Sequence, residues 1–370
     1  LLEKTDGYPF LVSLCTSIFS TTNAKAYAKI VKGLSLKRRA LGLTAHYQER
    51  LSDSSLKNIE ETLFQYSNDL EDIKSASETK KNQIKTLSEV TSEVLDEIDA
   101  RYNGSFVEKR LYTGIETFDD AFQSFTPGSL IILGARPAMG KTSFALDISS
   151  RIASKQQHPA LIFSFEMLSK QLCYRILSSK SQIQLSTLKS KDITDTQWGQ
   201  IGNGVQAISD INFLISDQTN LTVHEIASLS RKAVRTHGGV SLLVIDYLQL
   251  INLGPKAERN KAEAIEDASR FLKILAQDLD VPVLVLSQLN RQLEQRADKR
   301  PMVSDLRGSG GLEQDADAII LLYRDEVYNP DTMDKGITEV IIGKQRDGPI
   351  SVVGLQSDLK TFSYSDRSAY

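Results

Sequence analysis

The sequence has few cysteines and no long hydrophobic runs. Its two cysteines, Cys15 and Cys173, stand far apart and neither belongs to a Cys-x-x-Cys pair. This scarcity argues against a disulfide framework and against a zinc cage, and it fits a reducing, intracellular compartment. Apolar runs such as 242–245 and 318–322 are far shorter than the ~20 residues that a bilayer span needs. No charged and then apolar signal peptide opens the chain, so we expect a cytoplasmic protein.

Neither sign of charge dominates the chain. The 44 Lys and Arg residues against 47 Asp and Glu residues give a formal charge of −3, which excludes a polybasic coat. With 370 residues and 41% hydrophobic composition, the chain has enough apolar material for a packed core. A length of this kind predicts two to three domains of roughly 100 to 200 residues each. The chain starts at Leu1 rather than Met, so we expect the natural N-terminus to lie outside it.

Proline is nearly absent from residues 1–105, and this region reads as helical. Apolar residues recur there at spacings of three and four, at Ile59, Leu63, Tyr66, Leu70 and Ile73. The polar stretch 69–85 predicts an exposed connection and a domain boundary. Thr86 and Glu89 then form a capping-box signature before an amphipathic helix that should stop at 103–104. The apolar stripe of that helix needs a partner, which is either its own domain or a neighbouring subunit.

Beyond residue 110, β-rich apolar runs alternate with helical periods. We expect strands at 129–133, 160–165, 211–215, 241–245, 281–286, 318–322 and 340–342. Helices are expected between them at roughly 141–154, 168–179, 194–208, 222–237 and 260–279. Such alternation predicts an α/β fold with a mostly parallel sheet covered on both faces. The strands after residue 336 follow one another too closely for crossover helices and are expected to be antiparallel.

The strongest motif is Gly134-Ala-Arg-Pro-Ala-Met-Gly140-Lys141-Thr142, which follows a predicted strand and opens a predicted helix. This is the context of a phosphate-binding loop, in which backbone N–H groups at a helix N-terminus face the phosphates. Lys141 would neutralise phosphate charge, and the Thr142 hydroxyl would bind Mg²⁺. The motif departs from the strict form because Ala135 stands where the first glycine is usually found. The residues expected to contact ATP here are Ala135, Arg136, Pro137, Ala138, Met139, Gly140, Lys141, Thr142 and Ser143.

Three polar residues end predicted strands, at the edge where open α/β sheets gather their ligands. Asp246 is interpreted as the carboxylate that holds Mg²⁺ through a water. Glu166, one strand after the loop, could polarise the attacking water as general base, the alternative being a helix-capping acid. Gln288 could sense the γ-phosphate through a hydrogen bond, or have no such role.

Two basic segments follow. Residues 291–307 carry five Arg and Lys residues and lead into Gly308-Ser-Gly-Gly311, which predicts a flexible loop for a phosphate backbone or simply a solvated surface loop. Near the chain end, Lys344 and Arg346 lie on alternate positions of an extended segment and therefore point the same way. They could stabilise charge on a transferring phosphoryl group, or form a surface pair.

Taken in order, these motifs resemble the DnaB-type replicative helicase family over essentially all of residues 110–370. The segments that carry the resemblance are the phosphate loop, Phe163-Ser-Phe-Glu166-Met167, Val244-Ile-Asp246-Tyr247-Leu-Gln249-Leu, Ser287-Gln288-Leu-Asn290-Arg291, Ser304-Asp-Leu-Arg307, Glu313-Gln-Asp-Ala-Asp317 and Lys344-Gln-Arg346-Asp-Gly348. The match before residue 105 is weaker. There the resemblance implies a remnant of a helical N-terminal domain with a helical hairpin at 1–85 and a linker helix at 86–109.

The resemblance implies a RecA-like, Mg²⁺-dependent ATPase core at 110–370. It also implies a ring-shaped hexamer that moves 5′ to 3′ on single-stranded DNA and unwinds duplex at the replication fork, with a primase and a helicase loader as primosome partners. By the same resemblance, Glu166 is the general base, Asp246 the Walker B acid and Gln288 the γ-phosphate sensor.

The resemblance assigns further residues. Arg346 with Lys344 would be the finger supplied by the next subunit. Arg307, Gly308 and Gly310 fall on the family's DNA-backbone loop. Gly308 stands where a charged residue is common, so its contact would come from the backbone. Arg175 matches an arginine close to the nucleotide. These departures favour a phage-encoded member, which would act in the host cytoplasm.

Two other classes remain open on the sequence alone. A RecA-type DNA-dependent ATPase acting in recombination would share the core but lack the helical hairpin and the linker helix. A non-catalytic partner or loader module would not need both Glu166 and Asp246.

Overall fold

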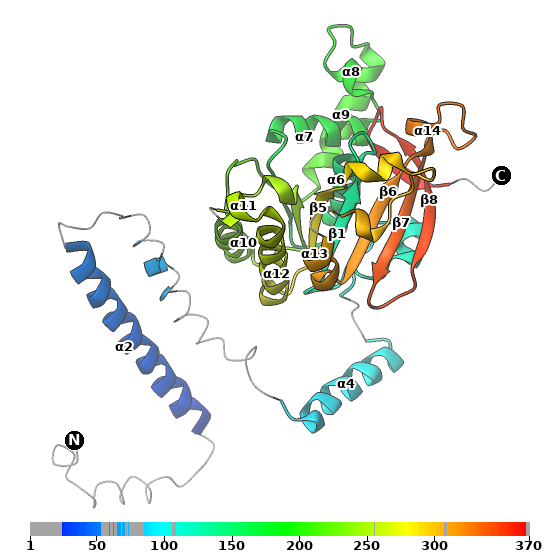
Figure 1. Ribbon diagram of the computed structural model, residues 1–370. Helices are drawn as coiled ribbons and strands as arrows, with labels where there is room; N and C mark the ends of the chain where they lie inside the picture. Colours follow the sequence, from blue (N-terminus) through cyan, green and yellow to red (C-terminus); the bar gives the residue numbers. More distant parts are fainter. Residues whose placement is uncertain are drawn as a thin grey trace, which may run out of the picture. The chain divides into compact units, whose positions relative to one another are not determined.

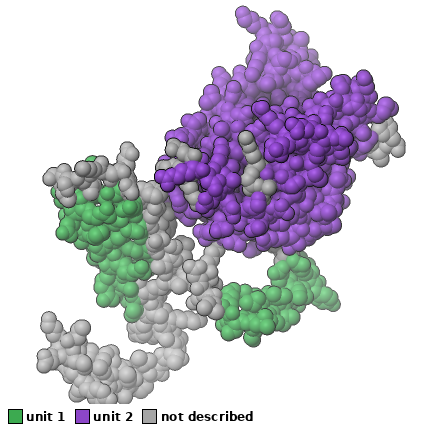
Figure 2. Space-filling view, viewed as in Figure 1, with its two compact units in different colours: residues 1–106 green, residues 107–370 purple. Residues whose placement is uncertain are grey.

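The computed structural model describes residues 24–52, 59, 62, 65–67, 69, 70, 73, 85–105, 109–254, 256–306 and 309–367. The chain separates into two compact units, Leu1–Phe106 and Val107–Tyr370, which Figure 2 distinguishes by colour. Among the residues that the structure describes, no helix combines the length and the apolar composition that crossing a membrane requires.

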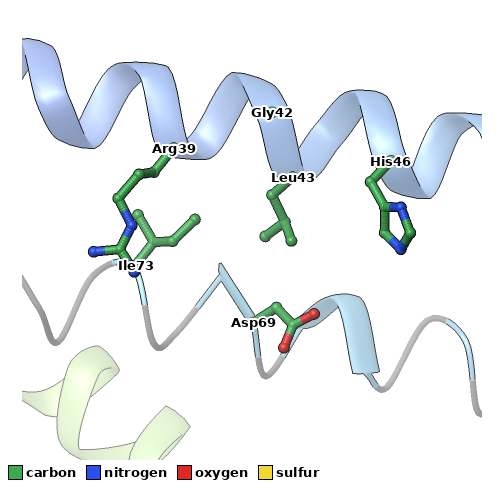
Figure 3. Close-up of a pocket in the computed structure, with 6 residues that line it drawn as sticks. All are labelled: Arg39, Gly42, Leu43, His46, Asp69 and Ile73. Atoms are coloured by element: carbon green, nitrogen blue, oxygen red, sulfur yellow. The ribbon is translucent and has the colours of Figure 1, made fainter.

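The first unit contains a long helix that packs against a later helical segment. Helix α2 spans Ala24–Ser52, and its Tyr47 is 3% exposed. The Tyr47 hydroxyl donates to Asp69 Oδ2 at 2.6 Å, and its ring lies 4.7 Å from that of Tyr66. The expected apolar stripe is helical at four of its five positions, while Leu63 and most of 71–85 lie outside the described residues. Figure 3 shows a cleft in this unit lined by Arg39, Gly42, Leu43, His46, Asp69 and Ile73.

Helix α4, Leu87–Tyr102, has the ends that the sequence predicts. Its N-terminal capping box is complete, because Glu89 N–H donates to Thr86 Oγ1 at 3.3 Å and Thr86 N–H donates to Glu89 Oε2 at 2.7 Å. The helix ends at Asn103. None of its side chains is buried, and Leu87 and Tyr102 are 82% and 89% exposed.

The second unit is built around one sheet of nine strands with helices on both faces (Figure 1). The strand order is β3-β2-β4-β5-β1-β6-β7-β8-β9. The strands are β1 Leu130–Ala135, β2 Ala160–Ser164, β3 Phe213–Ser216, β4 Leu242–Asp246, β5 Val283–Gln288, β6 Ala318–Tyr323, β7 Ile337–Gln345, β8 Ser351–Asp358 and β9 Ser363–Asp366. Strands β1 to β6 pair in parallel, whereas β7, β8 and β9 pair antiparallel, so the α/β prediction and the late change of direction are confirmed.

The helices of this unit also begin and end close to their predicted bounds. The longer ones are α6 Lys141–Lys155, α7 Ser169–Ser181, α9 Asp195–Ser209, α10 Val223–His237 and α12 Lys261–Leu279. The short ones are α5 Glu116–Ala121, α8 Leu185–Leu188, α11 Lys256–Arg259, α13 Ser309–Asp315 and α14 Asp325–Tyr328, with single turns η3 Leu248–Leu250, η4 Arg291–Gln295 and η5 Val303–Asp305.

Both faces of the central strands are buried, because side chains alternate along a strand. In β1, Ile131 and Leu133 join a core with α6 and the aromatic rings of Phe118 and Phe144. Leu130 and Ile132 join a second core with α10 and α12. The parallel strands therefore bring their carboxyl ends to one edge of the sheet, where loops between strand and helix are free to bind a ligand.

Candidate active site

The loop after β1 enters helix α6 through a glycine that no other residue can replace without strain. Gly140 has φ +87°, and a Cβ there would lie 2.5 Å from Tyr364 Oη. Tyr364 itself is buried in β9, and its hydroxyl donates to the Gly140 carbonyl at 3.2 Å. No side chain caps the first turn of α6, which leaves that helix N-terminus as an anion site.

The loop's departure from the strict motif has a packing reason. Gly134 belongs to β1, where a Cβ would meet Leu321 at 2.8 Å and Leu289 at 2.9 Å. The next residue, Ala135, is the last of the strand, with its side chain in the core. The first glycine of the motif is thus a close-packed strand residue here.

The side chains of the phosphate loop differ in burial and in their contacts. Arg136 is buried and donates from Nε to Glu294 Oε1 at 2.8 Å and from Nη1 to the Leu289 carbonyl at 2.9 Å. Its guanidinium therefore fixes the loop to the segment after β5. Met139 and Ser143 are buried, whereas Pro137 and Ala138 are exposed.

Thr142, Asp246 and Lys141 meet at the carboxyl edge of the sheet. Thr142 Oγ1 donates to Asp246 Oδ2 at 2.8 Å, and Lys141 Nζ lies 4.3 Å from the centroid of the Tyr247 ring. Burial lowers the pKa of Lys141, against the opposite pull of Asp246 and Glu166. Burial raises the pKa of Asp246, against the attraction of Lys141 and the hydrogen bond from Thr142.

One oxygen of this cluster lacks a partner. Asp246 is fully buried, and its Oδ1 accepts no hydrogen bond within the described part of the chain. Leaving such an acceptor unpaired costs about 1–3 kcal/mol. A hydroxyl and a buried carboxylate with a free oxygen suit the oxygen ligands and bound waters that Mg²⁺ prefers. Thr142 and Asp246 therefore fit the predicted magnesium site.

Glu166 lies just beyond strand β2, at the same edge. Ser164 pairs with Asp246 across β2 and β4, so Glu166 follows two residues past the level of Asp246. Its side chain is exposed, and its charge acts on Lys141, Tyr247 and Arg175. An accessible carboxylate near the loop lysine can reach a water beside a bound phosphate.

Gln288 ends β5 next to the phosphate loop, since it pairs with Ala135 of β1. Its position is tied to the neighbouring strand β4 through Gln249, a residue in turn η3 to which we assigned no role from sequence. Gln249 Nε2 donates to Ser287 Oγ at 2.9 Å, and its Oε1 accepts from Gln288 N–H at 3.3 Å. The sequence signal was the position of Gln249 three residues after Asp246.

Arg175 faces the site from α7. Burial lowers its pKa, and the carboxylates of Asp246 and Glu166 oppose that shift. Its guanidinium carbon lies 5.0 Å from the ring centroid of Phe362, a residue with φ +57° that the sequence did not single out.

Lys344 and Arg346 lie at the opposite end of the parallel strands, where their amino ends meet. Because β7 runs antiparallel to β6, Gln345 pairs with Ala318 at the amino end of β6, whereas Ala135 pairs with Leu322 at the carboxyl end. The two cations therefore do not meet the phosphate loop of their own chain. Both donate to backbone carbonyls at the end of α13 or just beyond it.

The predicted DNA loop is described only in part. Arg307 and Gly308 lie outside the described residues, and Gly310 is exposed in α13, where a Cβ would have no atom within 4 Å. The expectation of a flexible basic segment at 291–307 is wrong in part, because turns η4 and η5 order it. Arg296 pairs with Asp305 at 2.7 Å and Arg300 with Glu339 at 2.6 Å, so these two cations are already neutralised.

Comparisons with known proteins find matches over most of the chain. The family profile described as DnaB-like helicase C terminal domain matches residues 110–366. The replicative DNA helicase DnaB of Buchnera aphidicola subsp. Baizongia pistaciae is 38% identical over 356 residues, covering 96% of this chain and 77% of the relative. The replicative DNA helicase DnaC of Bacillus subtilis is 35% identical over 361 residues, with the same two coverages.

A solved structure is similar as well. It is described as the structure of a DnaB-like replicative helicase and its interactions with primase. It has 31% identity and a TM-score of 0.77, covering 99% of this chain and 85% of that one. The relatives and this structure are replicative helicases, which excludes the recombination ATPase that the sequence leaves open.

Proposed function

Since this chain belongs to the DnaB-like replicative helicase family and is an ATP-hydrolysing DNA helicase, we propose how its residues carry out that activity. The proposal depends above all on one observation: directly beside Lys141, the Thr142 hydroxyl bonds a buried Asp246 whose second oxygen has no hydrogen-bond partner among the described residues. This arrangement is a site for the phosphates of ATP together with Mg²⁺.

The phosphates bind at the N-terminus of α6, where backbone N–H groups of the phosphate loop and of the first helical turn face them and Lys141 neutralises their charge. Thr142 directly, and Asp246 through a water, would hold Mg²⁺, and the ion would supply positive charge against the charge that develops on the phosphates. Burial of Tyr364 beneath Gly140 keeps the loop in its binding conformation before ATP arrives.

Hydrolysis begins when the Glu166 carboxylate accepts a proton from a water in line with the γ-phosphate. The water oxygen forms a bond to phosphorus, the bond to the β,γ-bridging oxygen breaks, and ADP leaves. Gln288 senses whether the γ-phosphate is present, and Arg175 lies close to the nucleotide. Gln249 transmits a movement of Gln288 to the strand that carries Asp246, because it bonds both neighbouring residues of β5.

The site is completed by a neighbouring copy of the chain. Arg346 and Lys344 lie at the sheet edge away from their own loop, which favours a finger that acts on the ATP of the next subunit in a ring of six. Helix α4 would support assembly of the same ring, because none of its side chains is buried among the described residues and its apolar stripe suits docking on a neighbour. Of the two partners that the sequence leaves open for this helix, we therefore propose the neighbouring subunit and not the helix's own domain.

Single-stranded DNA binds in the channel of the ring through Arg307, Gly308 and Gly310, and the ring moves 5′ to 3′. Helix α13 links this contact to catalysis. Its second residue is Gly310, and the carbonyls of Glu313 and Ala316, about 5 Å and about 9 Å further along at 1.5 Å per residue, hold Lys344. A shift of the DNA loop therefore reaches the finger through one short helix. A primase and a helicase loader are the further partners that we propose.

The test is Glu166→Gln in the full chain. We expect it to bind ATP with unchanged affinity and to lose hydrolysis by about 10² or more, because a general base is removed and no charge-bearing loop residue is touched. Asp192→Asn, an exposed acid before α9, is the matched control and should hydrolyse at the wild-type rate. Hydrolysis and strand displacement by Glu166→Gln at wild-type rates would refute the assignment of the base.

A further inference from the structure

Asp317 is a buried carboxylate that the mechanism above does not use. It is 9% exposed and sits between the end of α13 and the start of β6. Its Oδ2 accepts from Leu130 N–H at 2.7 Å and from Lys273 Nζ at 2.7 Å. Its Oδ1 lies 3.3 Å from Arg346 Nη1.

The two bonds to Oδ2 hold this carboxylate in place. Leu130 is fully buried in β1, and its amide and carbonyl both bond Asp317, the carbonyl accepting from Asp317 N–H at 2.8 Å. Lys273 also donates to the Gly128 carbonyl at 2.9 Å, so the ammonium is fixed from a second side. Oδ1 is therefore a rigid acceptor that faces the guanidinium.

The side chain of Arg346, unlike that of Asp317, is exposed and weakly restrained. Its side chain is 53% exposed, while its backbone N–H donates to the Asp317 carbonyl at 3.0 Å. The other side-chain contact, from Nη2 to the Gln314 carbonyl, is long at 3.5 Å. The Asp317 carboxylate is thus the stronger restraint on the direction in which the guanidinium points, since charge-assisted bonds exceed neutral ones in strength.

We propose that Asp317 is a positioning residue that orients Arg346 toward the ATP of the neighbouring subunit. This inference rests on the proposed role of Arg346 as a finger. A guanidinium has five N–H donors, so one edge can remain on Asp317 while the other donates to phosphate. Holding the cation in place before the transition state forms avoids the cost of ordering a long, exposed side chain at each turnover.

Two other roles for the same contact make different predictions. If Asp317 instead competed with phosphate for Arg346, removal of its charge would speed hydrolysis. If Asp317 only tied α12 to the start of β1 and β6, its loss would weaken the fold independently of Arg346.

The experiment is a double-mutant cycle in the full chain, measured as ATP hydrolysis with single-stranded DNA. We expect Asp317→Asn to lower kcat about tenfold with KM for ATP unchanged, because orientation and not binding is lost. In an Arg346→Ala background, followed over hours with labelled ATP, Asp317→Asn should cause no further loss. A faster rate, a loss that adds fully to that of Arg346→Ala, or a wild-type rate would overturn the proposal.

Asp334→Asn is the matched control, since it removes the charge of a carboxylate that pairs with a different half-exposed arginine, Arg367 at 3.4 Å, and leaves Arg346 in place. It should hydrolyse ATP within about threefold of wild type, as it removes no interaction with the finger. A loss as large as that of Asp317→Asn would show that the loss does not depend on Arg346 and would overturn the proposal. If Asp317→Asn does not assemble, Asp317→Glu, which keeps the charge but moves it by one methylene, is judged by the same lower kcat and the same lack of additivity.

The finger role of Arg346 and the positioning role of Asp317 can be refuted separately. If Arg346→Ala hydrolyses ATP at the wild-type rate, the finger itself is wrong. If Arg346→Ala is inactive while Asp317→Asn is wild-type or additive, the finger stands and only the role of Asp317 is refuted.

Discussion

The arrangement of Arg346 predicts that two inactive variants restore each other when mixed. Strand pairing places Arg346 beyond the amino end of β6, since Gln345 pairs with Ala318 and Ala135 pairs with Leu322. Four residues separate these two levels of β6, or about 13 Å at ~3.3 Å per residue, before the spacing between strands is added. The finger is thus too far from its own phosphate loop to stabilise charge there.

The perturbation pairs Arg346→Ala, which keeps an intact loop, with Lys141→Ala, which keeps an intact finger. Each variant alone should be inactive, the first by about 10³ to 10⁵, the range for a lost finger. In a ring mixed at equal amounts, about a quarter of the interfaces combine an intact loop with an intact finger. Activity should therefore rise from near zero to roughly a quarter of the wild-type rate per site.

The assay is steady-state ATP hydrolysis with single-stranded DNA, after labelled subunits have shown that exchange occurs. Arg367→Ala is the matched control, because Arg367 is also half exposed and pairs with one carboxylate, that of Asp334 at 3.4 Å. It should be active alone. If subunits exchange and no activity returns, Arg346 acts within its own chain or has only a structural role, and the argument from strand order is refuted.

Three further changes test the site, and a fourth tests the DNA loop. Gly140→Ala should weaken nucleotide binding at least about tenfold, because the left-handed φ and the contact with Tyr364 Oη both oppose a Cβ. A fluorescent-nucleotide titration measures this, with Gly199→Ala as control, since nothing lies within 4 Å of a Cβ there. Tyr364→Phe removes the hydrogen bond to the Gly140 carbonyl and should lower the free energy of unfolding by about 0.5–1.5 kcal/mol in urea titrations; an unchanged midpoint would contradict it. Thr142→Ala should raise the Mg²⁺ concentration needed for half-maximal hydrolysis, and an unchanged requirement would remove Thr142 from the metal site. Arg307→Ala should reduce the dependence of log K on log salt for single-stranded DNA by about 0.7, and an unchanged slope would remove Arg307 from the channel.

Structural features that depend only on residues close together in the sequence could be predicted from the sequence. The capping boxes at Thr86 and Thr222 form because donor and acceptor lie three residues apart, and both are present in the structure. The phosphate loop follows a strand and opens a helix as expected, because its glycine and the helix start are adjacent. The α/β alternation likewise reads directly from periodicity, with the bounds of the parallel strands shifted by at most two residues.

Interactions between distant segments could not be read in this way. The composition of segment 291–307 predicts a flexible basic loop, yet Arg300 pairs with Glu339 of strand β7. The composition of a segment gives the number of its charged residues but does not show which of them form ion pairs in the folded protein. The same reason hides Gln249, whose role appears only because β4 and β5 are neighbours in the sheet.

The sequence by itself determined the chemistry available to this protein: a phosphate loop, a carboxylate at each of two strand ends and a late pair of cations. Only the tertiary structure decided which of them act together. Thr142 bonds Asp246 across 104 residues, and Tyr364 supports Gly140 across 224. Arg346 lies on the far edge of the sheet because β7 reverses direction after the parallel strands, and direction is set by strand pairing. Local sequence encodes what each element is, whereas sheet order and packing set which elements meet.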